Sequence, residues 1–300
     1  MSILNFTLTD LRYLTALYEE KHFARAAERS FVSQPTLSIA IKKLEDNLGI
    51  KIFERQNHDV LISSSGQKII DQAYKILCEA NNLNEIAKLS IKPYSEPLKI
   101  GAIFTIGPYL FPKFVRQIVK EIPKLKLLIE ENYTNVLFEK LMNGTLDVII
   151  IATPDEHKEL IQTPLFKDEL NLICSKNNKL AKHKSIKLSQ LQEETFLMLG
   201  TGHCLRDQVI EACPATNQNT NQFANLITSS SLETIKYMVE MDLGISILPN
   251  LAGQNLSDDI VIKKFGKGNS FRTISLVYRK NYPHHELIQQ IIPHLANSCN

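Results

Sequence analysis

Long hydrophobic runs are missing from this chain. No apolar stretch approaches the length needed to cross a membrane, and the first ten residues lack the basic start and apolar run of a signal peptide. We therefore expect a cytoplasmic protein with no membrane partner. An excess of charge is missing too, because 34 basic and 32 acidic residues leave a net charge of +2, which indicates no class of partner. With 300 residues, 44% of them hydrophobic, the chain can form two or three globular domains.

Cysteine is scarce, with five residues in the whole chain: Cys78, Cys174, Cys204, Cys213 and Cys299. An odd number of scattered cysteines does not resemble the disulfide framework of a secreted protein. In a reducing compartment, any disulfide would be transient and functional. No metal-ligand spacing is present, so we predict no metal site and no cofactor.

Two of the cysteines lie within residues 200–214, which read GTGHCLRDQVIEACP. Residues 195–199 predict a strand, a turn flanked by glycines follows, and residues 205–212 predict a short helix that Pro214 ends. Cys204 would lie where this helix begins. The helix dipole, with His203 and Arg206 alongside, would favour its thiolate, the reactive form.

Cys204 and Cys213 are nine positions apart. At 1.5 Å per residue, an intact helix would hold the two sulfurs about 13 Å apart, whereas a disulfide tolerates Cα separations of at most about 7 Å. The pair could therefore close only if the helix melts or moves. The alternative is two unrelated buried cysteines.

The first part of the chain predicts a helix-turn-helix. One short helix spans residues 23–29, and a second is capped by Ser33, carries Pro35 in its first turn and buries Leu37, Ile41 and Leu44. Such a second helix reads base edges with its N-terminal residues. The DNA-binding residues would be Gln34, Pro35, Thr36 and Ser38 at the bases, with Lys42, Lys43 and Arg55 at phosphates.

Charge supports this prediction only locally. Residues 21–43 hold five basic residues and one acidic residue, but residues 1–62 hold eight of each. A small three-helix packing module that binds no nucleic acid is the alternative. Residues 49–53 and 60–62 alternate apolar and polar around a polar turn, which predicts a hairpin, or wing, beside the second helix.

A long helix is predicted to begin at Ser65. Its apolar residues repeat in steps of four and three, at Ile69, Ala73, Ile76, Ala80, Leu83 and Ala87. This heptad seam needs a partner helix, most simply a second copy of itself. A homodimer would place two reading heads on a two-fold site in double-stranded DNA. The two prolines Pro93 and Pro97 predict a hinge after the helix.

The head resembles the winged helix-turn-helix of LysR-type transcriptional regulators. The resemblance rests on FARAAE at residues 23–28, VSQPTLS at residues 32–38 and IKKLE at residues 41–45. It implies an N-terminal all-α winged helix-turn-helix at 1–62, a long dimerising linker helix at 63–92, a hinge at 93–97 and a regulatory domain at 98–300. That domain would be an α/β two-lobed effector domain like periplasmic binding proteins, with lobe I at about 98–163 and 269–300 and lobe II at about 164–268. It also implies a homodimer or homotetramer.

The region after residue 97 alternates predicted strands and helices, which favours a parallel sheet. Ligands of such sheets bind beyond the carboxyl ends of the strands. Thr105 follows the first strand, Thr134 the second, and residues 201–204 follow the strand at Phe196. Taken singly, each threonine is more often a helix cap than a ligand group. Their shared placement with a cysteine is what predicts a site.

Three further segments resemble the hydrogen-peroxide-sensing members of the LysR family: TIGPYL at residues 105–110, LML followed by GHCLRDQ at residues 202–208, and RTISLVYR at residues 272–279. The resemblance implies that Cys204 is the peroxidatic and Cys213 the resolving cysteine. Its implied peroxide pocket comprises Thr105, Thr134, His203, Arg206, Asp207 and Arg272. Residues 212–219 depart from the family pattern, which leaves open how this loop refolds after oxidation.

The resemblance implies a transcriptional regulator rather than an enzyme. Promoter DNA, RNA polymerase and a cellular thiol reductant that resets the disulfide are the implied partners. One alternative is a LysR-type regulator whose cleft binds an ordinary small molecule, with structural cysteines. The other is a thiol peroxidase that uses the same pair.

Overall fold

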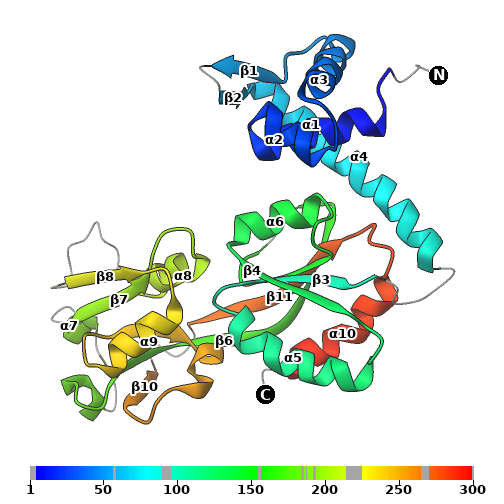
Figure 1. Ribbon diagram of the computed structural model, residues 1–300. Coiled ribbons are helices and arrows are strands. Elements are labelled where there is room, and N and C mark those ends of the chain that lie inside the picture. The colour runs from blue at the N-terminus through cyan, green and yellow to red at the C-terminus, as the bar shows by residue number, and fades with distance from the viewer. Residues whose placement is uncertain are drawn as a thin grey trace. The chain divides into compact units, whose positions relative to one another are not determined.

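The computed structural model describes residues 5–56, 59–89, 96–154, 157–183, 186, 188–191, 194–213, 225–264 and 270–298. The chain forms two compact units, the first from residues up to 93 and the second from most of the remainder (Figure 1). Each unit has its own hydrophobic core.

The first unit begins with three helices and a hairpin, which include the predicted helix-turn-helix and wing: α1 Leu8–Glu20, α2 Phe23–Arg29, α3 Gln34–Leu48, β1 Phe53–Gln56 and β2 Asp59–Ile62. The α1 helix begins with a capping box between Thr7 and Asp10. Ser33 caps α3 by accepting a hydrogen bond from the Thr36 backbone N–H at 3.3 Å. The winged helix-turn-helix fold is confirmed.

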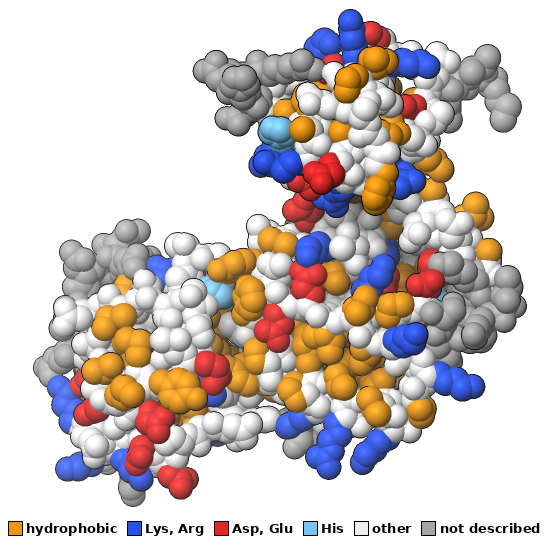
Figure 2. Space-filling model, viewed as in Figure 1, with side chains coloured by type: hydrophobic (Ala, Val, Ile, Leu, Met, Phe, Trp, Pro, Cys, Tyr) orange, Lys and Arg blue, Asp and Glu red, His pale blue; other side chains and the backbone are white. Residues whose placement is uncertain are grey.

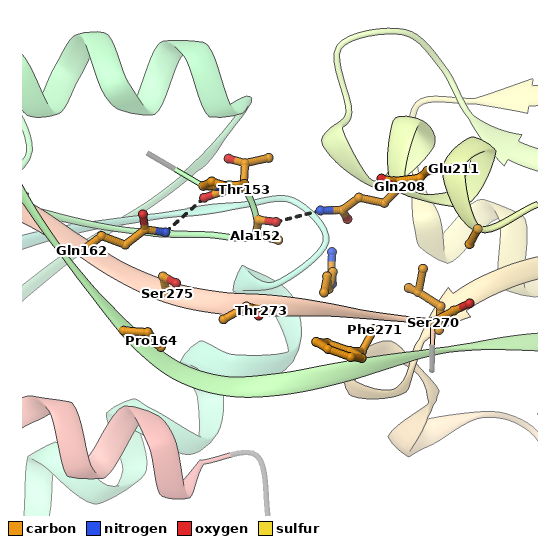
Figure 3. Close-up of a pocket in the computed structure, with 14 residues that line it drawn as sticks. Ala152, Thr153, Gln162, Pro164, Gln208, Glu211, Ser270, Phe271, Thr273 and Ser275 are labelled. Atoms are coloured by element: carbon orange, nitrogen blue, oxygen red, sulfur yellow. Dashed lines mark hydrogen bonds between the residues drawn. The ribbon is translucent and has the colours of Figure 1, made fainter. Parts of the chain in front are cut away.

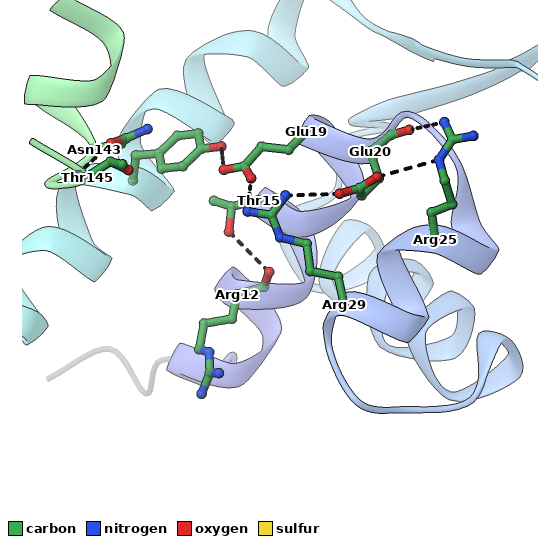
Figure 4. A network of polar contacts seen from close by, with 9 residues as sticks. Arg12, Thr15, Glu19, Glu20, Arg25, Arg29, Asn143 and Thr145 are labelled. Atoms are coloured by element: carbon green, nitrogen blue, oxygen red, sulfur yellow. Dashed lines mark hydrogen bonds and ion pairs between the residues drawn. The ribbon is translucent and has the colours of Figure 1, made fainter. Parts of the chain in front are cut away.

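Polar contacts tie these helices together. Arg29 pairs with both Glu19 and Glu20 of α1, and Arg25 pairs with Glu20 at 3.5 Å (Figure 4). The Tyr74 hydroxyl donates to Glu19 at 2.7 Å, which joins the long helix after the hairpin to the same network. The ion pairs are largely exposed, so each contributes little to stability.

Glu45 fastens α3 to the hairpin. Its carboxylate is buried and accepts from the backbone N–H groups of Ile52 at 2.8 Å and Phe53 at 3.0 Å, and from Lys51 Nζ at 2.9 Å. Burial alone would raise the pKa of Glu45, but these hydrogen bonds and the lysine charge hold it below its ordinary value. The wing is thus attached to α3 through a carboxylate.

The long helix α4 Ser64–Leu89 is present, but its predicted seam has two different halves. Ala73 is buried in the head core, and Ile69 and Ile76 pack against that core. Leu83 is 70% exposed. The expectation that the whole seam needs a second copy was wrong for the first half, because α1 of the same chain covers it.

The second unit is organised around a seven-stranded mixed sheet in the order β10-β6-β11-β5-β3-β4, with β9 paired to β6. Its first lobe holds the predicted parallel strands: β3 Leu98–Ile103, β4 Leu127–Asn132 and β5 Val148–Ile151. The helices of this lobe are α5 Gly107–Glu121, α6 Thr134–Met142 and α10 His285–Asn297. The β5 strand is buried along its whole length, as its continuous run of apolar residues predicts.

Two long strands continue from the first lobe into the second (Figure 1). They are β6 Leu160–Ser175 and β11 Phe271–Arg279, which pair antiparallel. The second lobe adds the parallel pair β7 Thr195–Leu199 and β8 Asn225–Ser229, with β9 Ser246–Pro249 and β10 Ile260–Lys264. Its helical elements are η1 Lys179–Lys182, α7 Leu188–Leu191, α8 Cys204–Ala212, α9 Leu232–Glu240 and η4 Asn250–Asn255. The α/β two-lobed effector fold is therefore confirmed.

Candidate functional site

The α8 helix carries the two central cysteines at its ends. Cys204 is its first residue, after His203 as N-cap, and Cys213 is its C-cap, with a backbone N–H that donates to Val209 O at 2.8 Å. Cys213 is fully buried in the core of the second lobe, whereas Cys204 is partly exposed. The two cysteines are not joined in a disulfide, and the intact helix between them corresponds to a separation of about 13 Å.

A buried ion pair lies at the junction of the lobes. Arg272 of β11 pairs with Asp168 of β6 at 3.0 Å, and the two residues are opposite each other in the strand register. The same guanidinium donates to Thr105 Oγ1 at 2.8 Å and to Thr105 O at 3.0 Å. Since all three side chains are almost completely buried, Arg272 is fixed in position with its charge balanced by one carboxylate.

Thr134 provides an unused hydroxyl. Its Oγ1 is buried and has no hydrogen-bond partner of regular geometry among the described residues. The side chain nevertheless interacts with the Cys204 thiol and lowers the pKa of that thiol. We interpret this contact as a loose one that leaves the hydroxyl able to bind a small molecule beside the sulfur.

The expected stabilisation of the Cys204 thiolate was wrong for this conformation. Burial is the largest influence and raises the pKa of the Cys204 thiol, while the nearby charge of Arg272 and the Thr134 contact lower it only partly. Neither predicted cation is among the main influences on this pKa. Burial lowers the pKa of His203, which favours a neutral ring, and Arg206 Nη1 donates to Leu199 O at 3.0 Å. The cation that acts on the thiol is therefore Arg272.

The remaining pocket residues are placed around this group in different ways. His203 is buried against Phe104 and Tyr133. Arg206 is buried and ties α8 to β7, and Asp207 is exposed in the first turn of α8. Thr134 and Arg272 thus each act on Cys204, and Arg272 also holds Thr105. For His203, Arg206 and Asp207, direct contact with peroxide stays a prediction.

Two cavities lie between the lobes. The larger, about 680 Å³, is lined by residues of α8, β6 and β11. Gln208 Nε2, at its edge, donates a hydrogen bond to Ala152 O at 2.7 Å (Figure 3). Cys204 does not line it. The smaller, about 330 Å³, is lined by Thr105, by aromatic residues of the first lobe, and by His203 of the second lobe. The larger volume therefore adjoins the cysteine helix rather than the thiol itself.

The head presents the predicted DNA-reading surface on α3. Gln34, Pro35, Thr36, Lys42 and Lys43 are exposed, and Ser38 is half-buried. The side chain of Arg55 lies outside the described residues. The sequence interpretation missed Ile39, which is 68% exposed on the same helix. Its position beside Ser38 could have drawn attention to it, because apolar side chains on a reading helix can contact thymine methyl groups.

Other contributors to the cysteine site were also missed. Asp168 gave no motif signal, and only its register opposite Arg272 reveals its role. Phe104 and Tyr133 each immediately precede a predicted threonine, which is a signal that could have identified them. Within the described ranges, His, Cys, Asp and Glu side chains form no group of three or more suited to a metal ion. None of the helices described is both long and apolar enough to span a membrane.

Comparisons with known proteins cover nearly the whole chain. Residues 8–67 match the family model "Bacterial regulatory helix-turn-helix protein, lysR family", and residues 92–300 match "LysR substrate binding domain". A hydrogen peroxide-inducible genes activator of Haemophilus influenzae is 39% identical over 278 residues, covering 92% of this chain and 91% of the relative.

Solved structures are similar over the same extent. A full-length OxyR variant from Pseudomonas aeruginosa is 41% identical with a TM-score of 0.76, covering 99% of this chain and 95% of that one. An OxyR cysteine variant from Corynebacterium glutamicum, described as H2O2-bound, is 28% identical with a TM-score of 0.62, covering 98% and 93%.

Proposed function

The chain belongs to the LysR family of bacterial transcriptional regulators, and we propose that it senses hydrogen peroxide through Cys204 and switches the expression of oxidative-stress defence genes. The observation that carries this proposal is the placement of the two thiols. Cys204 begins α8 beside the unused Thr134 hydroxyl and the charge of Arg272, and Cys213 closes the same helix in a buried core. The names of the similar proteins support the same chemistry.

The proposed reaction proceeds in two balanced steps. Cys204 loses its proton, its sulfur attacks one peroxide oxygen, an S–O bond forms and the O–O bond breaks, and water leaves. The sulfenic acid then condenses with the Cys213 thiol, forming the S–S bond and a second water. One peroxide is thus reduced to two waters while two thiols are oxidised. Thr134 and Arg272 are placed to stabilise the developing charge on oxygen.

The second step couples chemistry to shape. Because an intact α8 separates the sulfurs by about 13 Å, the helix must unwind before the disulfide can form. Unwinding also removes Cys213 from the core of the second lobe and breaks the tie from Gln208 to Ala152. The second lobe would then repack, which would alter the contacts between copies and the spacing of their reading heads on DNA.

Thiol trapping tests this directly. Peroxide-treated full-length protein should yield a Cys204–Cys213 disulfide by mass mapping, and Cys213→Ser should instead accumulate a sulfenic acid at Cys204. Cys204→Ser should abolish the DNA response to oxidant. Cys174→Ser is the control, because Cys174 is buried in β6 and burial raises its pKa. Pairing of Cys204 with Cys174, or no oxidation of Cys204, would overturn the proposal.

The proposed partners follow from the two units. The exposed α3 residues would contact double-stranded promoter DNA, and RNA polymerase and a thiol reductant would complete the response in the cytoplasm. A homodimer or homotetramer is supported by apolar side chains that gather over α5 and α9 in Figure 2. Exposed large apolar side chains of this unit include Val119 of α5, Leu128 and Ile129 of β4, Tyr237 of α9, and Met241 and Leu243 just after α9.

The cavity of about 680 Å³ favours one alternative, a regulator that binds an ordinary small molecule between the lobes. Such a regulator should keep its inducer response in Cys204→Ser. A thiol peroxidase, the alternative from another class, should consume many peroxides per chain when supplied with a reductant. Consumption of only a few peroxides per chain under the same conditions supports a sensor.

A further inference from the structure

We propose that Phe104, Tyr133 and His203 form an aromatic clamp that positions the start of α8 for reaction with peroxide and restrains the later release of that helix. This inference rests on the proposed function. The clamp consists of three side chains from three different loops, two in the first lobe and one in the second. They act through Cys204 and are positioning residues.

The rings are in mutual contact. The Tyr133 and His203 ring centroids are 4.9 Å apart, those of Phe104 and Tyr133 are 5.3 Å apart, and those of Phe104 and His203 are 6.0 Å apart. The Phe104–Tyr133 pair is edge-to-face, an arrangement that aromatic quadrupoles favour. Three mutual contacts make a closed cluster rather than a chain of pairs, so moving one ring disturbs both others.

Each ring precedes a residue of the thiol site in the chain. Phe104 precedes Thr105, Tyr133 precedes Thr134, and His203 precedes Cys204. A ring held in the cluster therefore fixes the backbone from which the next site residue projects. In this way the cluster links the two threonine loops of the first lobe to the first residue of α8.

The turn before α8 is shaped to accept Tyr133. Gly202 has a φ of +94°, a conformation that side chains rarely adopt, and a Cβ there would lie 3.3 Å from Tyr133 Cε1. The tyrosine ring thus lies directly against the turn. Glycine at this position allows both the turn and the contact.

His203 is held from two sides. The Ser230 backbone carbonyl accepts from its ring, whereas Nε2 is buried and has no hydrogen-bond partner among the described residues. With one ring nitrogen tied to the second lobe and the ring packed at a tilt against Phe104 and Tyr133 of the first lobe, His203 can leave only when the clamp opens. Since His203 is the N-cap of α8, unwinding from this end requires that step.

The clamp should therefore affect the two chemical steps in opposite directions. Loss of a ring frees the start of α8, so the Cys204 thiol spends less time beside Thr134 and Arg272 and sulfenic acid forms more slowly. The same loss makes unwinding easier, so the disulfide closes faster. Aromatic contacts of this kind correspond to changes of about threefold to tenfold in each rate.

The experiment compares Tyr133→Leu with Tyr133→Phe in the full-length protein. Sulfenic acid formation is timed after mixing with hydrogen peroxide in a Cys213→Ser background, and disulfide closure is timed with Cys213 present. Tyr133→Leu should slow the first step and speed the second, and Tyr133→Phe should restore both rates. Phe104→Leu is a second, milder route to the same result should Tyr133→Leu fold poorly.

Phe138→Leu is the matched control, because Phe138 contacts His157 at 5.5 Å in another aromatic pair of the same unit. It should leave both rates unchanged. Equal rates in Tyr133→Leu and wild type, or slowing of both steps together with a lower melting temperature, would overturn the clamp. Absence of sulfenic acid in the Cys213→Ser protein with an intact clamp would instead overturn the proposed peroxide function.

Discussion

At the scale of single residues, the site depends on a thiol that is protonated at rest. Burial raises the pKa of Cys204 and Arg272 only partly offsets that rise, so the reactive thiolate is a minor species at neutral pH. Such a thiol reacts when a ligand or a small motion stabilises the thiolate more than the resting site does. The buried pair of Arg272 and Asp168 limits how much charge reaches the sulfur.

The pH dependence of Cys204 should reflect this balance. Its alkylation rate in the Cys213→Ser protein should rise with pH, with a midpoint above the value of about 8.5 for a free cysteine. Replacing the pair by Arg272→Met with Asp168→Asn should move the midpoint higher still, because the charge that lowers the pKa is lost. Peptide-resolved mass spectrometry provides the measurement, with the exposed Arg116→Leu as control. A midpoint at or below that of free cysteine would contradict the pKa shift.

Ile39 should contribute to sequence preference. It is 68% exposed on the reading helix, and an apolar contact with a thymine methyl is worth about fourfold in affinity. The test uses a DNA duplex that was selected for binding to this protein. Replacing one or more of its thymines by uracil should weaken binding of the wild-type protein by about that factor and leave the affinity of Ile39→Ala unchanged. Lys42→Ala should bind more weakly on both duplexes and keep the preference. If no thymine position distinguishes wild type from Ile39→Ala, the side chain does not read DNA.

At the scale of elements, hydrophobic periodicity and caps predicted most of the fold. Ser33 and Pro35 marked the start of α3, and residues 148–151 identified a strand covered on both faces. The α8 helix was predicted from a glycine turn and a terminal proline, and it forms between the two cysteines. Local signals of this kind are sufficient to predict helices and strands because capping, turns and burial patterns involve residues a few positions apart.

Contacts between distant residues could not be predicted in the same way. Arg272 and Asp168 are 104 positions apart, and only the register of β6 and β11 brings them together. The expected Cys204 thiolate failed for a related reason, since burial raises the thiol pKa more than the nearby charge and hydrogen bonds lower it. Desolvation of the thiol depends on every segment packed around it, whereas the neighbouring residues in the sequence indicate only some of the nearby charges.

The attachment of the wing to α3 should be sensitive to Glu45. Glu45→Ala leaves two buried N–H groups without their acceptor, at a cost of about 2 kcal/mol, and should speed hydrogen exchange at Ile52 and Phe53 by about thirtyfold. The exposed Asp46→Ala is the control. Because the folded pKa of Glu45 lies below its unfolded value, this stabilisation should be complete at neutral pH and be lost as pH falls through the folded pKa. Unchanged exchange in Glu45→Ala would show that other contacts hold the wing.

At the scale of the whole molecule, the second half of α4 presents the surface most suited to a second copy. Leu83 is 70% and Ile86 54% exposed, while the first half of the helix is already covered by its own head. Leu83→Asp should weaken self-association by about tenfold or more and weaken DNA binding with it. Light scattering across a dilution series measures this, with the neighbouring Asn84→Asp as control for the added charge. Self-association that survives Leu83→Asp would place the interface elsewhere.

The long strand β6 limits how such a chain can evolve by recombination. Its sixteen residues supply backbone pairing to both lobes, and β11 does the same from the far end of the sequence. Neither lobe can therefore be exchanged with a relative's by a single crossover without replacing part of the other. Recombination that yields a folded protein should therefore transfer the second unit whole and join it, near residue 93, to the DNA-binding unit of a relative. The DNA target and the sensed signal would then be inherited separately.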